Sequence, residues 1–159
     1  YEISLGLVGS EMCIRDRNSE ITIRTYPIRL TEENAQEIIS QYDIVVDGCD
    51  NFSTRYLIND ICAEMGKVYV YGAICGFEGQ VSVFHYGEEK KSYRDLYPDE
   101  EEMRRMPPPP KGVMGITPAV TGSIEATEVL KIICGFGEVL SGKLWTIDLR
   151  TLQSNKFSL

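Results

Sequence analysis

Hydrophobic positions alternate with polar ones in two stretches of the chain and form short unbroken runs in two others. Residues 20–28 and 79–86 alternate and are rich in β-branched side chains, which is typical of half-buried strands. Residues 42–47 (YDIVVD) and 67–74 (KVYVYGAI) contain short apolar runs, as in strands buried on both faces of a parallel sheet. The pattern therefore predicts four strands in this part of the chain.

Two stretches between these strands have the spacing of helices. Thr31 is a good N-terminal cap, and apolar residues follow it at helical intervals as far as residue 39. Residues 52–65 predict a second helix, which ends before Gly66 because glycine readily closes a helix in the left-handed conformation.

The longest predicted helix covers residues 117–134. Thr117 is expected to cap it, Pro118 suits its first position, and Gly135 follows its end. Most of its positions are apolar, so the helix is expected to be mostly buried with one narrow polar stripe. That stripe consists of Glu125, Glu128 and Lys131.

The remaining segments complete an α/β pattern. Residues 88–112 are charged and contain Pro107–Pro110, which excludes helix and interior strand, so a long surface loop is expected. Two β segments, 143–149 and 154–159, finish the chain. The alternation of strands and helices predicts a Rossmann-like α/β domain with a largely parallel sheet and right-handed crossovers.

The first residues do not resemble a natural protein segment. Glu11–Arg17 matches the translation of a transposase-end adapter used in sequencing libraries, so residues 1–17 are interpreted as non-native and residues 18–159 as the domain. Gly6 and Gly9 are accordingly not interpreted as a phosphate-binding loop, and their spacing also differs from G-x-G-x-x-G.

Composition narrows the classes of function. The 159 residues carry a net charge of −8, which argues against broad binding to nucleic acid or anionic membrane. No apolar run is long enough to span a bilayer. The five cysteines form no C-x-x-C pair, so reduced, buried thiols in a cytoplasmic protein are expected, without a zinc site. His85 is the only histidine, which makes a Ser/His/Asp device improbable.

Candidate chemistry follows the strand at 42–47. Ligands of open α/β sheets bind at the carboxyl ends of strands, and Asp50 and Asn51 stand at such an end. Asp50 is a candidate Mg²⁺ ligand and Asn51 a candidate nucleotide contact, although the same position also suits a helix cap. Arg55 and Asn59 share one face of the next helix and are candidates to meet an anionic ligand or a partner's carboxylate; the alternative is a solvated salt bridge.

Four motifs in a fixed order carry a family resemblance. They are DIVVDGCDNFSTRYLIND (43–60), GAICGFEGQVSVF (72–84), YRDLYP (93–98) and GVMGITPAVTGSIEATEVLK (112–131). Together they resemble the ThiF/MoeB/HesA family, whose members use ATP to adenylate the C-terminal glycine of small ubiquitin-like sulfur carriers in thiamine and molybdopterin pathways.

The resemblance assigns roles to the candidate residues. Asp50 corresponds to the magnesium-site aspartate of D-N-x-x-x-R, Asn51 would touch ATP, and Arg55, with Asn59 on the same face, would lie near the carrier's tail. The segment before Gly112 would cover the channel for that tail. Family members are commonly homodimers, so the resemblance also admits a homodimer.

The chain departs from the family pattern in three respects. The glycine-rich loop, the ribose-binding acid and the phosphate-reaching Arg and Lys lie upstream of the match, so the nucleotide-binding half is expected to be missing and the fragment to be inactive. Ser92 and Asp95 stand where many members have a zinc C-x-x-C, so no zinc is expected. Residues 98–111 contain no cysteine, which argues against a covalent intermediate there.

Two other functions fit parts of the sequence. A non-catalytic relative that only binds a carrier or partner protein agrees with the missing loop cysteine, whereas the Asp50, Asn51 and Arg55 set argues against it. A redox dinucleotide-binding domain has little support, because no G-x-G-x-x-G is present to hold the cofactor. A truncated sheet edge would also predispose the chain to aggregate.

Overall fold

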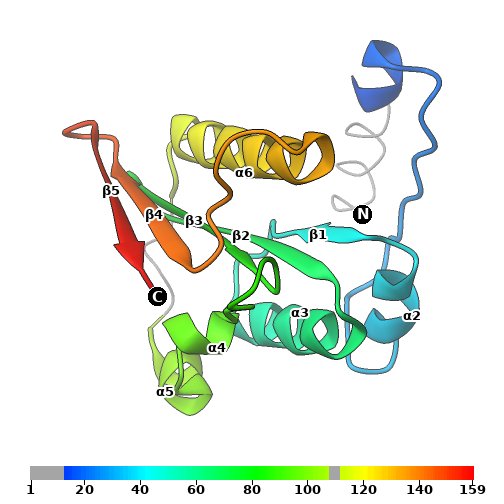
Figure 1. The fold of residues 1–159 in the computed structure, drawn as a ribbon, viewed down its shortest axis with the longest axis horizontal. Coiled ribbons are helices and arrows are strands. Elements are labelled where there is room, and N and C mark those ends of the chain that lie inside the picture. The colour runs from blue at the N-terminus through cyan, green and yellow to red at the C-terminus, as the bar shows by residue number, and fades with distance from the viewer. Residues whose placement is uncertain (1–12, 108–111) are drawn as a thin grey trace. The chain divides into compact units, whose positions relative to one another are not determined.

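The computed structural model describes residues 13–107 and 112–159, drawn as ribbons in Figure 1. The chain separates into two compact units, Tyr1–Leu30 and Thr31–Leu159. In the first unit, residues 13–17 are helical and residues 20–28 contain no strand, so the strand predicted there is wrong. β-branched residues favour strands only where a neighbouring strand completes the hydrogen-bond ladder.

The second unit contains one five-stranded sheet in the order β1-β2-β3-β4-β5. β1 and β2 are parallel, whereas the three following pairs are antiparallel. The α/β class is confirmed, but among the described residues the sheet is mixed, and the parallel arrangement is limited to its first pair. The strands are Ile44–Val46 (β1), Val68–Cys75 (β2), Glu78–Phe84 (β3), Lys143–Asp148 (β4) and Gln153–Ser158 (β5).

Helices cover both faces of this sheet. α6 packs on β2 and β3 from one side, and α3 and α4 lie on the other (Figure 1). The described helices of this unit are Ala35–Ser40 (α2), Phe52–Met65 (α3), Tyr93–Leu96 (α4), Glu100–Arg105 (α5) and Ile116–Cys134 (α6). None of the helices in the described part of the chain is long and apolar enough to cross a membrane.

The ends of α3 confirm the sequence prediction. The Asn51 side chain accepts a hydrogen bond from the Thr54 amide at 2.9 Å and so caps the helix. Gly66 closes it with φ +63°.

The start predicted for α2 is wrong, because Thr31 begins a turn in which its amide donates to the Asn34 side chain at 2.8 Å. The helix itself begins only at Ala35.

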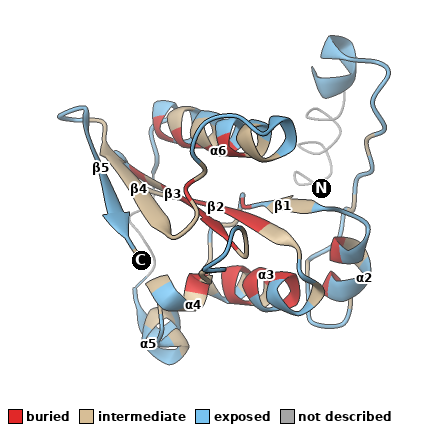
Figure 2. Ribbon diagram, viewed as in Figure 1, coloured by how far each residue is buried: buried red, intermediate tan, exposed pale blue. Residues whose placement is uncertain are grey.

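The polar stripe of α6 faces inward. Thr117 does not cap the helix as predicted, since its hydroxyl donates to the Gly76 carbonyl at 2.9 Å and Gly115 occupies the capping position. The buried residues of α6 are all polar, whereas several large apolar ones are exposed (Figure 2). The buried set is Thr117, Thr121, Glu125 and Glu128, and the exposed set includes Ile116, Leu130 and Ile133.

The segment expected to be one long loop contains two short helices, α4 and α5. Ser92 starts α4 with a reciprocal capping box, in which the Ser92 amide donates to the Asp95 carboxylate at 2.7 Å. Asp99 caps α5 through the Glu102 amide at 2.9 Å. These local caps allow a charged segment to form helix, and the prolines at 108–110 lie outside the described residues.

The core is divided by the sheet. On the α6 side, Val70, Val81 and Val83 are fully buried, while the α3 side holds a group of packed aromatic rings. Those rings belong to Tyr56, Tyr69, Tyr71, Phe84 and Tyr93. The expectation that residues 42–47 are buried on both faces is wrong, since Tyr42 and Val46 are 39% and 49% exposed and Asp47 is the buried residue of this stretch.

Candidate functional site

The centre of the candidate site is Asp47, which directly follows β1. Its amide donates to the Val70 carbonyl at 2.9 Å and continues the pairing with β2. Its buried carboxylate accepts three hydrogen bonds: from the Cys49 amide at 2.7 Å, from the Arg55 Nε at 2.8 Å and from the Tyr69 hydroxyl at 3.1 Å. The carboxylate thus links the loop after β1 to α3 and to β2.

Arg55 comes from the first turns of α3 and lies inside the protein, 8% exposed. Besides Asp47, its Nη2 donates to the carbonyls of Cys49 at 2.5 Å and Gly72 at 3.3 Å, and its guanidinium lies over the Tyr71 ring. Burial lowers the pKa of Arg55, but the Asp47 carboxylate outweighs it and leaves that pKa raised. The alternative of a solvated salt bridge is wrong, since this ion pair is buried.

Asp50 and Asn51 stand next to this ion pair at the carboxyl end of β1. Asn51 caps α3, which confirms the alternative that this position starts the following helix as its cap. Its side-chain amide nitrogen also donates to the Asp50 carboxylate at 3.2 Å. Asp50 is exposed. Among the described residues, the bond from Asn51 is the one hydrogen bond that its side chain accepts. An outward carboxylate with spare acceptor capacity at a strand end fits a Mg²⁺ ligand.

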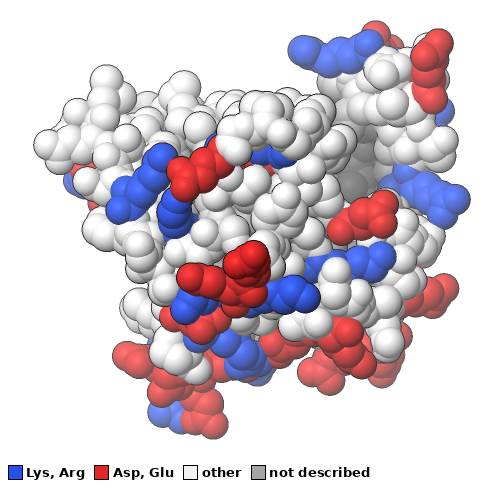
Figure 3. Space-filling view, in the orientation of Figure 1, with Lys and Arg blue, Asp and Glu red and all other residues white. Residues whose placement is uncertain are grey.

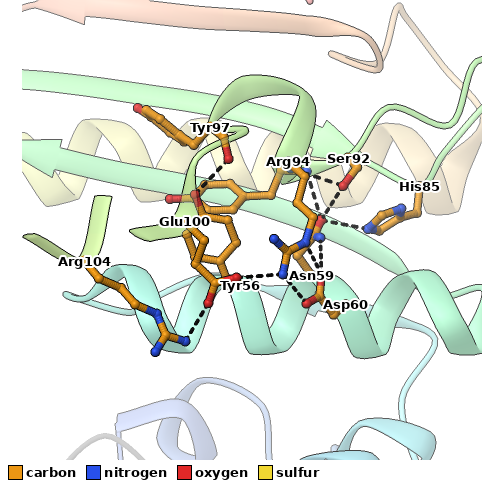
Figure 4. Close-up of polar contacts among 10 residues, drawn as sticks. Tyr56, Asn59, Asp60, His85, Ser92, Arg94, Tyr97, Glu100 and Arg104 are labelled. Atoms are coloured by element: carbon orange, nitrogen blue, oxygen red, sulfur yellow. Dashed lines mark hydrogen bonds and ion pairs between the residues drawn. The ribbon is translucent and has the colours of Figure 1, made fainter. Parts of the chain in front are cut away.

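Asn59 is one of the most completely buried side chains on α3, at 1% exposure. Its Oδ1 accepts from the Tyr93 amide at 2.9 Å and the Ser92 hydroxyl at 3.2 Å, and His85 Nε2 lies 3.0 Å away (Figure 4). Because an amide oxygen only accepts, Nε2 of His85 carries the proton. Burial lowers the pKa of His85 and favours its neutral form. Asn59 therefore binds the start of the segment that follows β3, residues 85–105, to α3. Its contact with a carrier tail stays a prediction.

An ion pair nearer the surface also joins this segment to α3. Arg94 binds Asp60 through two hydrogen bonds of 2.8 and 2.6 Å and reaches Glu100 at 2.9 Å (Figure 4). Its guanidinium lies over the Tyr56 ring, 4.8 Å from the centroid. Charged side chains of both signs gather over the α3 to α5 side, whereas the α6 side of the molecule is mainly uncharged in the view of Figure 3.

A second buried carboxyl group lies on the other face of the sheet. Glu125 is 7% exposed, and its carboxyl group packs so closely on Gly72 that a Cβ there would lie 2.3 Å from it. Within the described residues its Oε1 has no hydrogen-bond partner, and neither has the Thr121 hydroxyl. Burial, followed by the nearby Asp47 charge, raises the pKa of Glu125 to about 7.

The sequence reasoning missed Asp47, Tyr69 and Glu125 as parts of this region. Asp47 is part of the motif at 43–60, but the motif gave it no role. The one sequence signal for Glu125 was its polar side chain on a mostly apolar helix.

The cysteine side chains differ in burial. The expectation that the thiols are buried is confirmed only for Cys62. Burial, with Asp47, raises the pKa of the half-buried Cys49 to about 12, so it is a thiol at neutral pH. The other three, Cys13, Cys75 and Cys134, are exposed.

Curated relatives of similar sequence are adenylyltransferases by name. A "Probable molybdopterin-synthase adenylyltransferase" of Pyropia yezoensis is 45% identical over 148 residues, covering 92% of this chain and 39% of the relative. A "Sulfur carrier protein adenylyltransferase" of Thermus thermophilus is 46% identical over 143 residues, covering 82% of this chain and 50% of the relative. The chain thus spans half or less of the length of these relatives.

Solved structures with the same fold are more distant in sequence. MccB of E. coli with ATP superimposes with a TM-score of 0.74 at 18% identity, covering 93% of this chain and 46% of that chain. PaaA superimposes with a TM-score of 0.75 at 13% identity, covering 96% and 47%. At such identities the similarity supports the fold alone.

The family model described as the ThiF family matches residues 10–159, which include every motif and every candidate residue discussed above. The match agrees with the fold and with the order of the motifs. This chain belongs to the ThiF family.

Proposed function

We propose that the protein to which this chain belongs adenylates the C-terminal glycine of a ubiquitin-like sulfur carrier, of the thiamine or molybdopterin type, at the expense of ATP. The observation that carries the proposal is Asp50. It is an exposed carboxylate at the carboxyl end of β1, presented by a loop that buried side chains hold, in a chain of the ThiF family. Relatives at 45–46% identity bear the names of adenylyltransferases, one for a sulfur carrier protein.

The proposed reaction joins two anionic groups. A carboxylate oxygen of the carrier attacks the α-phosphorus of ATP, the bond to the β-phosphate oxygen breaks, and pyrophosphate leaves with its electron pair. Such a step requires the reactants to be aligned and the phosphate charge to be neutralised. Asp50 would hold Mg²⁺, which supplies that neutralisation, and Asn51 would lie beside the nucleotide.

Arg55 and Asn59 enter this proposal mainly as supports. Both are buried and engaged with protein groups, Arg55 with the loop after β1 and Asn59 with the segment that follows β3. Direct contact of either with the tail of the carrier stays a prediction. A homodimer and a cytoplasmic location also stay predictions.

This chain covers 39% and 50% of the two relatives that are named adenylyltransferases, so the whole reaction is a proposal for this chain. We predict that the 159-residue chain alone exchanges no pyrophosphate into ATP, since the phosphate-binding half of the family pattern is not among its residues. The alternative function is a relative that binds a carrier or another protein without catalysis.

The deciding experiment is carrier-dependent exchange of labelled pyrophosphate into ATP. It is made with this chain and with an extended protein, which is whatever longer open reading frame the source DNA shows to contain residues 18–159. The proposal expects Mg²⁺-dependent exchange by the extended protein and at least a hundredfold loss in its Asp50→Ala variant, as for other charge-stabilising groups. Asp43→Ala, at the other end of β1 and also exposed, is the matched control. Carrier binding without any exchange would establish the alternative.

A further inference from the structure

We propose that Asp47 and Arg55 are positioning residues, which together hold the loop between β1 and α3 in the conformation that presents Asp50. This inference rests on the proposed function, because Asp50 is the residue presented. It assigns to Asp47 a role that the motif alone did not give, and to Arg55 a role inside the protein rather than at the tail of a carrier.

The first observation is the way in which the loop is gripped. Cys49 is the residue just before Asp50, and both of its backbone groups are bound by this one ion pair. Its amide donates to the Asp47 Oδ1 at 2.7 Å, and its carbonyl accepts from the Arg55 Nη2 at 2.5 Å. Fixing both groups of one peptide residue restricts the direction in which the next residue leaves, so the position of Asp50 depends on the pair.

The second observation is that the ion pair is anchored to two further elements. Tyr69 of β2 donates its hydroxyl to the Asp47 Oδ2 at 3.1 Å, and the carbonyl of Gly72 accepts from the Arg55 Nη2 at 3.3 Å. The position of the loop is thereby fixed relative to β2 as well as to α3. Chemical groups built on strands and helices are held more accurately than groups that rely on loop packing alone.

Stability alone gives a poor reason for such an arrangement. A buried ion pair is often no more stabilising than apolar residues of the same volume, because both charges lose their hydration. The side chains of Arg55 and Asp47 are 9% and 0% exposed, so this loss is nearly complete here. What the charges do supply is a set of directed hydrogen bonds to one loop residue, which an apolar pair would not provide.

Nε and Nη2 of Arg55 bind groups inside the protein, which leaves Nη1 as the part of the guanidinium without a hydrogen bond among the described residues. Its Nε and Nη2 are engaged with Asp47, Cys49 and Gly72, and one face of the guanidinium lies over Tyr71, with 5.6 Å between Cζ and the ring centroid. Because Arg55 is only 8% exposed, its main action on a substrate would pass through the loop and Asp50.

The test compares two variants with a control. The double variant Asp47→Asn with Arg55→Gln removes both charges and leaves no lone buried ion. Arg55→Lys keeps a charge beside Asp47 but loses the planar set of donors that reaches both carbonyls. The control is Glu101→Gln with Arg105→Gln, an exposed i,i+4 ion pair on α5. If the double variant fails to melt cooperatively, the Arg55→Lys variant decides the test, because it retains the compensating charge.

Two readouts are made on the chain as it stands. The first is the hydrogen-exchange rate of the Cys49 amide, and the second is the broadening of loop amide signals by added Mn²⁺ as a probe of Asp50. The inference expects faster exchange at Cys49 and weaker Mn²⁺ binding, each by about tenfold or more, in a variant that still melts cooperatively. A merely structural role would lower the melting temperature and leave both readouts of the folded state unchanged, which would overturn the inference.

The two proposals can fail separately. If Asp50→Ala leaves pyrophosphate exchange by the extended protein unchanged, the metal role of Asp50 fails, and with it the proposed function. The exchange rate of Cys49 still decides whether Asp47 and Arg55 fix the loop. If Mn²⁺ binds equally well to the unmodified chain, both variants and the control, Asp50 needs no positioning and the inference is wrong.

Discussion

The two faces of the sheet bury carboxyl groups in opposite ways. On the α3 side, Asp47 is surrounded by an arginine, a tyrosine hydroxyl and a backbone amide, and its charge is compensated. On the α6 side, Glu125 lies against Gly72 with an oxygen that finds no partner among the described residues. A carboxyl group without compensation avoids its desolvation cost by taking up a proton.

The comparison teaches that burial alone does not define a role. The Asp47 carboxylate is paired with a cation and directs a loop, whereas Glu125 has no such partner among the described residues and is about half protonated at pH 7, because its pKa is raised to about 7. A third carboxylate, Glu128, shows the compensated form on α6 itself, since it binds Lys131 at 2.6 Å and the Leu140 amide at 2.8 Å. The following experiments test whether the two faces differ as described.

The largest effect is expected for Arg55→Met, which leaves the Asp47 carboxylate buried without its cation. Breaking a buried pair in this way costs about 3–5 kcal/mol of unfolding free energy. Urea denaturation followed by circular dichroism measures it. Arg105→Met, which breaks an exposed pair of α5, should cost less than about 1 kcal/mol. Equal effects of the two variants would mean that the Asp47 side is no more sensitive than the surface.

The next effect is the pH dependence contributed by Glu125. Its pKa is about 7 in the folded chain against an ordinary value of 4.5, so the folded state binds the proton more tightly. The resulting stability is complete below pH 4.5 and is lost as the pH rises through 7, by up to about 3 kcal/mol. Glu125→Gln should abolish this decline. Urea denaturation between pH 4.5 and 8 measures it, and parallel pH profiles of the two proteins would disprove the assignment.

A smaller effect is expected where α6 touches β2. In Gly72→Ala the new methyl group would meet the Glu125 carboxyl group, and such overpacking costs about 1–3 kcal/mol. Gly48→Ala is the matched control, because nothing lies within 4 Å of a Cβ at Gly48. Combining Gly72→Ala with Glu125→Ala should recover part of the loss in thermal unfolding. An undiminished loss in the double variant would show that the contact is not the cause.

The smallest effect separates partnered from unpartnered hydroxyl groups. Thr121→Val removes a buried hydroxyl that has no partner among the described residues, so it should be neutral or raise stability by about 1 kcal/mol. Ser82→Ala removes a hydroxyl that donates to the Lys143 carbonyl at 2.8 Å, and it should cost about 1 kcal/mol. The melting temperature should therefore fall in Ser82→Ala and stay unchanged or rise in Thr121→Val. A loss of stability in both would indicate that Thr121 has a partner after all.

Local signals in the sequence predicted local structure well. The bounds of α3 followed from a capping Asn and a closing Gly, and β2 and β3 followed from hydrophobic pattern to within two residues. The failures were of another kind. Residues 20–28 had the composition of a strand without becoming one, and the charged stretch after β3 formed α4 and α5 through caps whose strength the composition did not reveal.

The candidate site was divided in the same way. Asp50 and Asn51 could be placed at the end of β1 from sequence order, because strands and the helices that follow them are contiguous. The environment of Arg55 could not, since its partners include Gly72, seventeen positions away, and its burial depends on packing between α3 and β2. Spacing put Arg55 and Asn59 on one face of α3, but only packing decided that this face points inward.

By itself, the sequence determined the family and the α/β class, because each depends on the order of motifs and elements along the chain. It also determined the ends of α3 and the position of Asp50 at the end of a strand, because these depend on residues that are close together in sequence. The tertiary structure alone decided that Glu125 and Glu128 of α6 are buried, that Asp47 and Arg55 bind the backbone of Cys49, and that Glu125 lies against Gly72. These contacts join segments remote in sequence, and the charge state of a side chain follows from the groups around it rather than from its neighbours along the chain.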